Sequence, residues 1–238
     1  MGASYFIFKG IDSRSMGIVS GGAAPLIRAE ERVEHVTIPG RSGDLTVTEG
    51  ERIFNSYIQT YQISVRGSEN KRRVMDWLTG EGYVTFSTDP DRRQKARVIG
   101  AVTLNKVSKN MDAYTGEIQF YCSPLKEEIS DAAVTLTAAG TVMNSGDVEA
   151  RPKITVTCTA GATVVITAGG GTFTVDLDGR SDTGCVIDSG AEMVTSLDGT
   201  VNLTALSSGP FPRLSAGIVS IGGSGWTRLS IERRCCFI

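Results

Sequence analysis

Histidine, the commonest general acid and base near neutral pH, occurs once in this sequence, at position 35. A histidine-based catalytic triad or metal cluster would have to be built around His35 alone. It lies in residues 33–38, whose pattern places Val33 and His35 on one face of a strand. A single histidine in this setting is typical of a structural or surface residue, and we expect no catalytic role for it.

Acidic side chains offer two further kinds of chemistry. Asp176, Asp178 and Asp182 superficially resemble a calcium loop, but Arg180 occupies a ligand position and the closing glutamate is missing. Asp176 and Asp188 could be the paired carboxylates of a glycosidase, which must lie roughly 5 to 10 Å apart. Nothing in the sequence brings these two together. We expect no enzyme and no catalytic residue, and the spacing of the possible ligands predicts neither a metal nor a cofactor.

Two basic runs, residues 71–73 and 92–97, could contact nucleic acid. Acids such as Glu69 and Asp89 stand beside them, which is typical of a solvated helix face or loop. The whole chain carries 24 Lys and Arg against 26 Asp and Glu, a net charge of -2. Because proteins that grip a phosphate backbone carry a positive excess, nucleic acid is not the expected main ligand.

The cysteines and the apolar runs indicate the cellular compartment of the protein. The five cysteines are an odd number without metal-ligand spacing, which favours a reducing, intracellular origin. No apolar run approaches the roughly 18 residues of a membrane-spanning helix, and the N-terminus lacks the cationic start of a secretory signal. We therefore expect neither secretion nor a membrane partner.

The elements that position these residues are predicted to be strands. Apolar and polar side chains alternate, or short β-branched runs are bounded by Gly, Asp and Ser, at residues 33–38, 61–66, 96–104, 117–122, 154–158, 164–166, 173–177, 201–205 and 229–231. One segment has helical spacing instead. Ser68 can cap a helix over residues 69–79, in which Val74, Trp77 and Leu78 form an apolar stripe. We expect this helix to cover one face of a sheet.

The composition changes near Pro124. Residues 1–130 hold 17 basic and 16 acidic side chains, whereas residues 131–238 hold 7 and 10. Proline stops a strand and charges keep a segment solvated, so residues 126–130 are predicted to be a linker. We expect a mainly β protein with two β-sandwich-like domains, residues 1–125 with the single packed helix and residues 131–238.

Several segments in register resemble one protein family. The motif Ile-Pro-Gly-Arg-Ser-Gly at residues 38–43 is similar to a motif of the distal tail (Dit) proteins of siphophages, the phages with long non-contractile tails, and of related prophages. Further similar segments of the first half are residues 5–18, 77–80, 86–90 and 120–124. In the second half, residues 144–146, 151–154, 186–189, 209–212 and 216–217 resemble the galectin-like C-terminal domain of the same proteins.

The resemblance implies a structural role in the virion. Such proteins form a hexameric ring at the tip of the tail tube, assembled in the host cytoplasm, through which DNA passes as cargo. They dock to the tail tube protein on one side and to the tail-tip or tail-associated lysin protein on the other, and some carry a receptor-binding protein. The family has no catalytic residues to transfer to this chain.

The residues themselves favour assembly as well. A closed ring uses interfaces in which one patch meets a different patch on the next copy, and exposed strand edges suit such contacts. Residues 37–48 could form an arm that docks on a neighbour, with these candidate interface residues: Ile38, Pro39, Gly40, Arg41, Ser42 and Gly43. The alternative is a carbohydrate-binding module that recognises the host surface, for which Phe211 and Trp226 are the candidate aromatic platforms.

Overall fold

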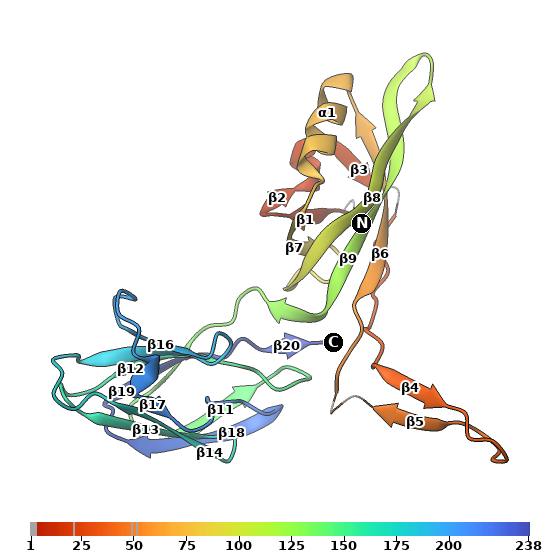
Figure 1. Ribbon diagram of the computed structural model, residues 1–238. Coiled ribbons are helices and arrows are strands. Elements are labelled where there is room, and N and C mark those ends of the chain that lie inside the picture. The colour runs from red at the N-terminus through yellow and green to blue at the C-terminus, as the bar shows by residue number, and fades with distance from the viewer. Residues whose placement is uncertain (1–3, 21, 49, 51) are drawn as a thin grey trace. The chain divides into compact units, whose positions relative to one another are not determined.

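The computed structural model describes residues 4–20, 22–48, 50 and 52–238. The chain divides into two compact units (Figure 1). The N-terminal unit is Met1–Ile129 together with Ile238, and the C-terminal unit is Ser130–Phe237. Both consist mainly of β-strands, so the predicted mainly β fold is confirmed. Among the described residues, no helix is long and apolar enough to cross a membrane.

The N-terminal unit contains one long, curled antiparallel sheet and a separate two-stranded ribbon. The sheet order is β2-β1-β7-β8-β9-β6-β3, and β4 pairs with β5. The elements are β1 (Phe6–Phe8), β2 (Ile11–Asp12), the 3-10 helix η1 (Ser13–Met16), β3 (Ile18–Ser20), β4 (Val33–Val36), β5 (Leu45–Thr48), β6 (Tyr57–Arg66), α1 (Ser68–Trp77), β7 (Glu81–Phe86), β8 (Arg92–Ser108) and β9 (Met111–Glu128).

An aromatic core holds the helix α1 against this sheet. Phe6 stacks on Trp77 with ring centroids 5.6 Å apart, and it meets Phe120 edge-on at 5.5 Å. The predicted stripe of Val74, Trp77 and Leu78 is buried against these strands. Burying each large apolar side chain stabilises the fold by roughly 1.5 to 3 kcal/mol. The predicted role of the helix as a cover for the sheet is confirmed.

The predicted start of this helix is wrong. Ser68 is the first helical residue, and the N-cap is Gly67, which provides no side-chain cap. Asp112 replaces the expected cap from outside the helix, because its Oδ2 accepts a hydrogen bond of 2.8 Å from the Ser68 backbone N–H. A cap supplied from another strand leaves no local signal in the sequence.

Proline 124 does not end a strand as predicted. Strand β9 continues through Pro124 to Glu128, so most of the segment predicted as a linker is strand. The register between β8 and β9 shifts between the pairs Ala96–Cys122 and Gln94–Lys126, and Pro124 lies inside this irregularity. A proline without an N–H is tolerated where a bulge already interrupts the hydrogen-bond ladder.

The C-terminal unit is a sandwich of two five-stranded antiparallel sheets, with orders β10-β19-β12-β15-β16 and β11-β18-β13-β14-β17 in its described part. Buried side chains of both sheets, such as Ile154 and Phe173, form one core. The elements are β10 (Val134–Leu136), β11 (Gly140–Asn144), β12 (Lys153–Thr157), β13 (Thr163–Ala168), β14 (Gly171–Asp176), β15 (Gly184–Asp188), β16 (Met193–Ser196), η2 (Thr204–Leu206), β17 (Ser207–Ser208), β18 (Gly217–Ser224), β19 (Arg228–Glu232) and β20 (Cys236–Phe237).

One strand predicted in this unit is wrong. Residues 201–205 contain a single bridge and the start of η2 instead. The Asn202 side chain accepts a hydrogen bond of 2.9 Å from the Thr204 backbone N–H, and the Thr204 hydroxyl accepts one from the Val194 N–H. Such local side-chain bonds compete with a strand ladder, which explains why the alternating pattern misleads here.

Candidate interaction surfaces

The ribbon of β4 and β5, with the turn between them, forms an arm spanning residues 33–48 (Figure 1). Every residue of this arm is exposed. A two-stranded hairpin without further packing is only marginally stable in water. The arm therefore belongs to the class of elements that gain stability when a partner covers them.

The six candidate residues at positions 38–43 lie at the tip of the arm. The Arg41 backbone N–H donates a hydrogen bond of 3.2 Å to the Ile38 carbonyl, which closes a turn with Pro39 and Gly40 at its centre. Gly40 has a φ of 82°, so the turn is of type II, in which proline and glycine suit these two positions. The Ile-Pro-Gly-Arg motif thus shapes the tip.

The two faces of the arm differ in polarity. Residues directly opposite each other in an antiparallel pair point to the same face. One face, the apolar arm face, carries Val36 opposite Leu45, and Val47 opposite Glu34. Its three apolar side chains are 39 to 42% exposed. The other face carries Val33 opposite Thr48 and His35 opposite Thr46, so most of the exposed apolar surface of the two strands lies on the apolar arm face.

Buried polar side chains anchor the chain segment that leads into the arm. Gln59 Nε2 donates a hydrogen bond of 3.0 Å to the Pro25 carbonyl, and Lys126 Nζ donates one of 3.4 Å to the Ile27 carbonyl. Lys126 also pairs with Asp89 at 3.5 Å. Sequence reasoning missed these anchors. The available signal was that Gln59 falls on the apolar side of the alternation in β6.

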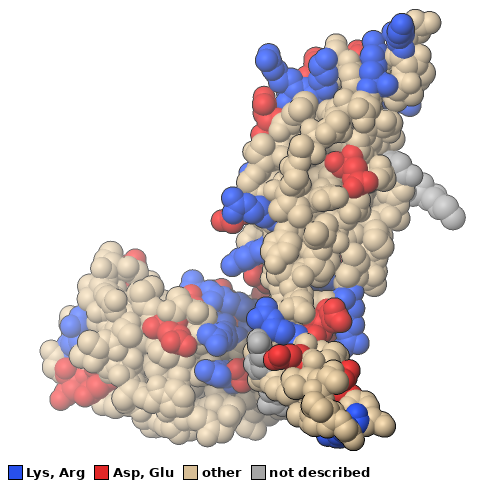
Figure 2. Space-filling model, turned by 45° about the vertical axis from the view of Figure 1, so that its right-hand side comes forward, with Lys and Arg blue, Asp and Glu red and all other residues tan. Residues whose placement is uncertain are grey.

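The two basic runs behave differently in the structure. Along β8, Arg93 pairs with Glu127 at 3.4 Å and Arg97 approaches Glu81 at 4.0 Å, so neighbouring strands neutralise this run. Residues 71–73 lie on α1, at the end of the N-terminal unit where Lys and Arg gather (Figure 2). Of the two basic runs, residues 71–73 are the one that contributes to a concentration of positive charge.

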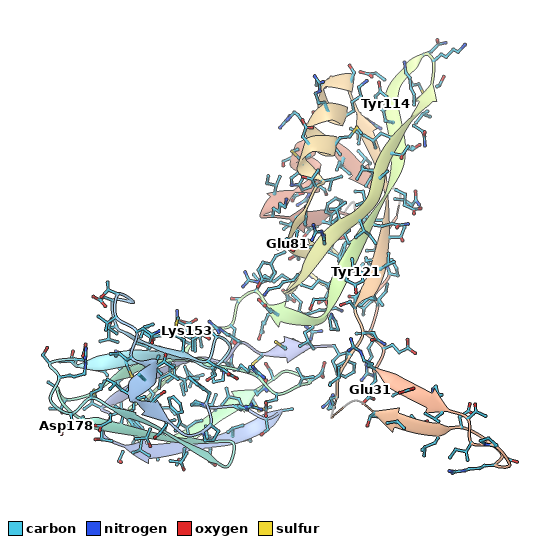
Figure 3. The ribbon with its side chains drawn as sticks, viewed as in Figure 1. Glu31, Glu81, Tyr114, Tyr121, Lys153 and Asp178 are labelled. Atoms are coloured by element: carbon cyan, nitrogen blue, oxygen red, sulfur yellow. The ribbon has the colours of Figure 1, made fainter. Side chains whose placement is uncertain are left out.

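The face of the N-terminal sheet opposite α1 is open and mostly polar. Glu81 and Tyr121 lie on it, as Figure 3 shows, whereas Tyr114 is turned to the covered side. The outward side chains along its middle are Thr60, Gln62, Ser64, Thr103, Asn105, Thr115, Glu117 and Gln119. An open hollow of about 280 Å³ lies over part of this face. Nearly all of these groups are uncharged hydrogen-bonding groups.

The residues considered for catalysis are occupied by structural contacts. His35 Nδ1 lies 3.2 Å from the Thr46 hydroxyl on the exposed arm. Asp176 and Asp188 belong to different sheets of the sandwich. Asp188 forms a two-pronged ion pair with Arg234 at 2.7 and 2.9 Å, which lowers the pKa of its carboxyl group. A glycosidase acid needs a raised pKa instead.

In the acidic turn that resembles a calcium loop, two of the carboxylates bind groups of the turn itself. Asp176 Oδ1 accepts a hydrogen bond from the Asp178 N–H at 3.2 Å, and Asp182 pairs with Arg180 at 2.6 Å.

The two aromatic residues considered as sugar-binding platforms also make packing contacts. Phe211 packs on Phe173 with centroids 4.6 Å apart, and Trp226 packs against the core of the sandwich.

No protein-family model and no curated protein sequence matches this chain. Among solved structures, it is similar to the Dit protein of phage SPP1, described as a paradigm of the hub adsorption apparatus in phages that infect Gram-positive bacteria. The two share 18% sequence identity with a TM-score of 0.74, and the match covers 97% of this chain and 98% of that chain. The likeness shows the fold, and it confirms the predicted resemblance.

Proposed function

We propose that this chain is a structural component of a phage tail tip, a distal tail protein whose six copies form a ring. The observation that carries the proposal is the likeness in fold to a phage hub protein over 97% of the chain. The ring would join the tail tube to the tail-tip or tail-associated lysin protein and to the adsorption apparatus. The chain would be assembled in the bacterial cytoplasm and act in the virion, without a catalytic step.

The arm supports the ring. A cyclic assembly is closed by an interface in which one patch of each copy meets a different patch of the next. The apolar arm face, Val36, Leu45 and Val47, is exposed on an element that has little packing of its own. Docked on the next copy, this face would leave water, and the arm would gain the support that a lone hairpin lacks.

The open sheet face supports a DNA channel. DNA must slide past the wall, and a wall lined with unpaired Lys and Arg would hold phosphate groups instead of releasing them. The middle of this face carries Thr, Ser, Asn and Gln side chains with one acid, Glu117. Such a surface stays hydrated and binds phosphate weakly, as a wall for passing DNA requires.

The ring is tested by size-exclusion chromatography with light scattering, followed by negative-stain imaging. Wild-type chains of 25.3 kDa are expected to give annular particles of about six copies. The double variant Val36→Asp/Leu45→Asp places two charges on the apolar arm face and is expected to stay monomeric. Both residues are exposed, so the unit itself should still fold.

A matched control places the same charges on the other face. In His35→Asp/Thr46→Asp the two residues are also directly opposite each other, and this variant is expected to form rings like the wild type. Wild-type protein that stays monomeric when mixed with its neighbouring tail proteins would contradict the proposed function. Equal loss of rings in both variants would remove the assignment of the apolar arm face.

A further inference from the structure

One end of the N-terminal unit concentrates positive charge from three elements. This basic end consists of Arg66, Lys71, Arg72, Arg73, Lys106 and Lys109. The strand pairs Arg66–Ala113 and Lys106–Tyr114 bring the end of β6 and the tip of the β8–β9 hairpin together. Lys71 Nζ lies 5.0 Å above the Tyr114 ring, which places the first turns of α1 beside them. Figure 2 shows Lys and Arg side chains gathered at this end.

The charge of the basic end is not neutralised within the unit. Across the described residues, none of the six cations belongs to an ion pair. The same segments contain three acids, Glu69, Asp76 and Asp112, and Asp112 accepts a hydrogen bond from the Ser68 N–H. These segments carry six cations and three acids, an excess of positive charge, whereas the whole chain has a net charge of -2. Like charges repel when they are gathered, so this arrangement costs stability unless an anion compensates it.

Apolar side chains are exposed among these cations. Val107 and Met111, at the tip of the hairpin, are 50% and 54% exposed, and Met75 on α1 is 44% exposed. Arg and Met are enriched in protein interfaces relative to the rest of the surface. Contacts to a phosphate backbone use cationic and polar groups and do not call for exposed aliphatic side chains. The combination therefore favours a protein over a nucleic acid.

We propose that the basic end docks a partner protein whose surface carries carboxylates around an apolar centre. The carboxylates would pair with Arg72, Lys106 and Lys109, and the apolar centre would cover Val107 and Met111. Complementary charge of this kind speeds association and sets the orientation of docking. A single copy carries the whole site, so the proposal stands or falls separately from the ring.

The test uses fluorescence anisotropy with three labelled probes: a glutamate–tyrosine copolymer, polyglutamate and a short duplex DNA. The full chain is expected to bind the copolymer more tightly than polyglutamate, because only the copolymer offers apolar contacts to Val107 and Met111. Both affinities should fall as salt rises from about 50 to 200 mM. Val107→Ser is expected to reduce the advantage of the copolymer and leave polyglutamate binding unchanged.

Charge-reversal variants locate the site. Lys106→Glu/Lys109→Glu is expected to weaken binding of both acidic polymers roughly tenfold or more. The control Arg28→Glu/Arg228→Glu changes the net charge equally at exposed positions elsewhere and should bind like the wild type. Light scattering reports the size of every variant, so a failed ring is recognised independently of the binding result.

Each other outcome overturns the proposal in its own way. Tighter binding of DNA than of either acidic polymer would make the basic end a nucleic-acid site. Equal losses in the two charge-reversal variants would show a general charge effect without a site. A change of particle mass in Lys106→Glu/Lys109→Glu alone would show that a second copy occupies this end. Absence of binding at about 50 mM salt would leave no docking site for an acidic protein.

Discussion

At the scale of single residues, burial makes the core cysteines unreactive. Cys122 in the N-terminal unit and Cys185 in the C-terminal unit are fully buried. Desolvation raises the pKa of each thiol to about 12. The thiolate is the reactive form of cysteine, so these side chains are chemically silent near neutral pH and serve as small apolar core residues. This is in keeping with a protein that works through its surfaces.

These raised pKa values predict how stability depends on pH. A thiol of the unfolded chain ionises near pH 8.5, whereas Cys122 in the folded chain resists ionisation until about pH 12. The unfolded state therefore loses protons first, and the stability present below about pH 8.5 falls as pH rises toward 12. Urea unfolding should show that Cys122→Val loses roughly 1.5 to 2 kcal/mol less than the wild type between about pH 8 and 10. Equal losses in both proteins would contradict the buried, neutral thiol.

At the scale of elements, the sequence predicts where strands lie better than where they end. The alternation at residues 61–66 and 117–122 matches β6 and β9 because one face of each strand is buried and the other is not. The errors at Ser68 and Pro124 share a cause. A cap from Asp112 and a bulge between β8 and β9 are contacts between distant segments, which a local pattern does not contain.

The arm of residues 33–48 likewise combines features that the local sequence predicts with features that depend on contacts between distant segments. The turn at Pro39 and Gly40 can be predicted from the sequence, because the backbone preferences of these two residues suit a type II turn. The apolar arm face depends on the pairing of Val36 with Leu45, which alternation within one strand does not reveal. The anchor of the arm, Gln59 bonded to the Pro25 carbonyl, requires the tertiary fold. Local residue preferences therefore predict the turn at the tip of the arm, whereas its apolar face and its anchor depend on contacts between distant segments.

In the β8–β9 hairpin, the two strands approach each other closely at Gly116, and we expect a larger residue there to destabilise the fold. A Cβ atom added at Gly116 would lie 2.2 Å from the Thr103 carbonyl oxygen, far inside contact distance. Gly116→Ala must therefore push β8 away from β9, and we expect it to reduce the free energy of unfolding by roughly 1 to 3 kcal/mol. Urea denaturation measures this loss.

The control for this prediction is another glycine in open space. A Cβ atom at Gly22 would meet no atom within 4 Å, so Gly22→Ala should stay within about 0.5 kcal/mol of the wild type. If Gly116→Ala were as stable as Gly22→Ala, the close approach of the Thr103 carbonyl to β9 would be refuted.

At the scale of the whole molecule, the residues that the structure describes form two hydrophobic cores that share no residue. One surrounds Phe120 in the N-terminal unit, and the other surrounds Phe173 in the C-terminal unit. The chain has two tryptophans, and each core has one of them packed in it or against it: Trp77 in the first and Trp226 against the second. Each unit thus contains its own fluorescent reporter.

Separate cores predict separate unfolding. Trp77→Phe leaves Trp226 to report the C-terminal unit, and Trp226→Phe leaves Trp77 to report the N-terminal unit. Adding Phe120→Ala should lower the urea midpoint reported by Trp77, since removing a buried phenyl ring costs roughly 3 to 5 kcal/mol. The midpoint reported by Trp226 should stay unchanged, and Phe173→Ala should give the reverse pattern. If either truncation moved both midpoints equally, the two units would be one cooperative domain, and the boundary predicted between residues 125 and 131 would be wrong.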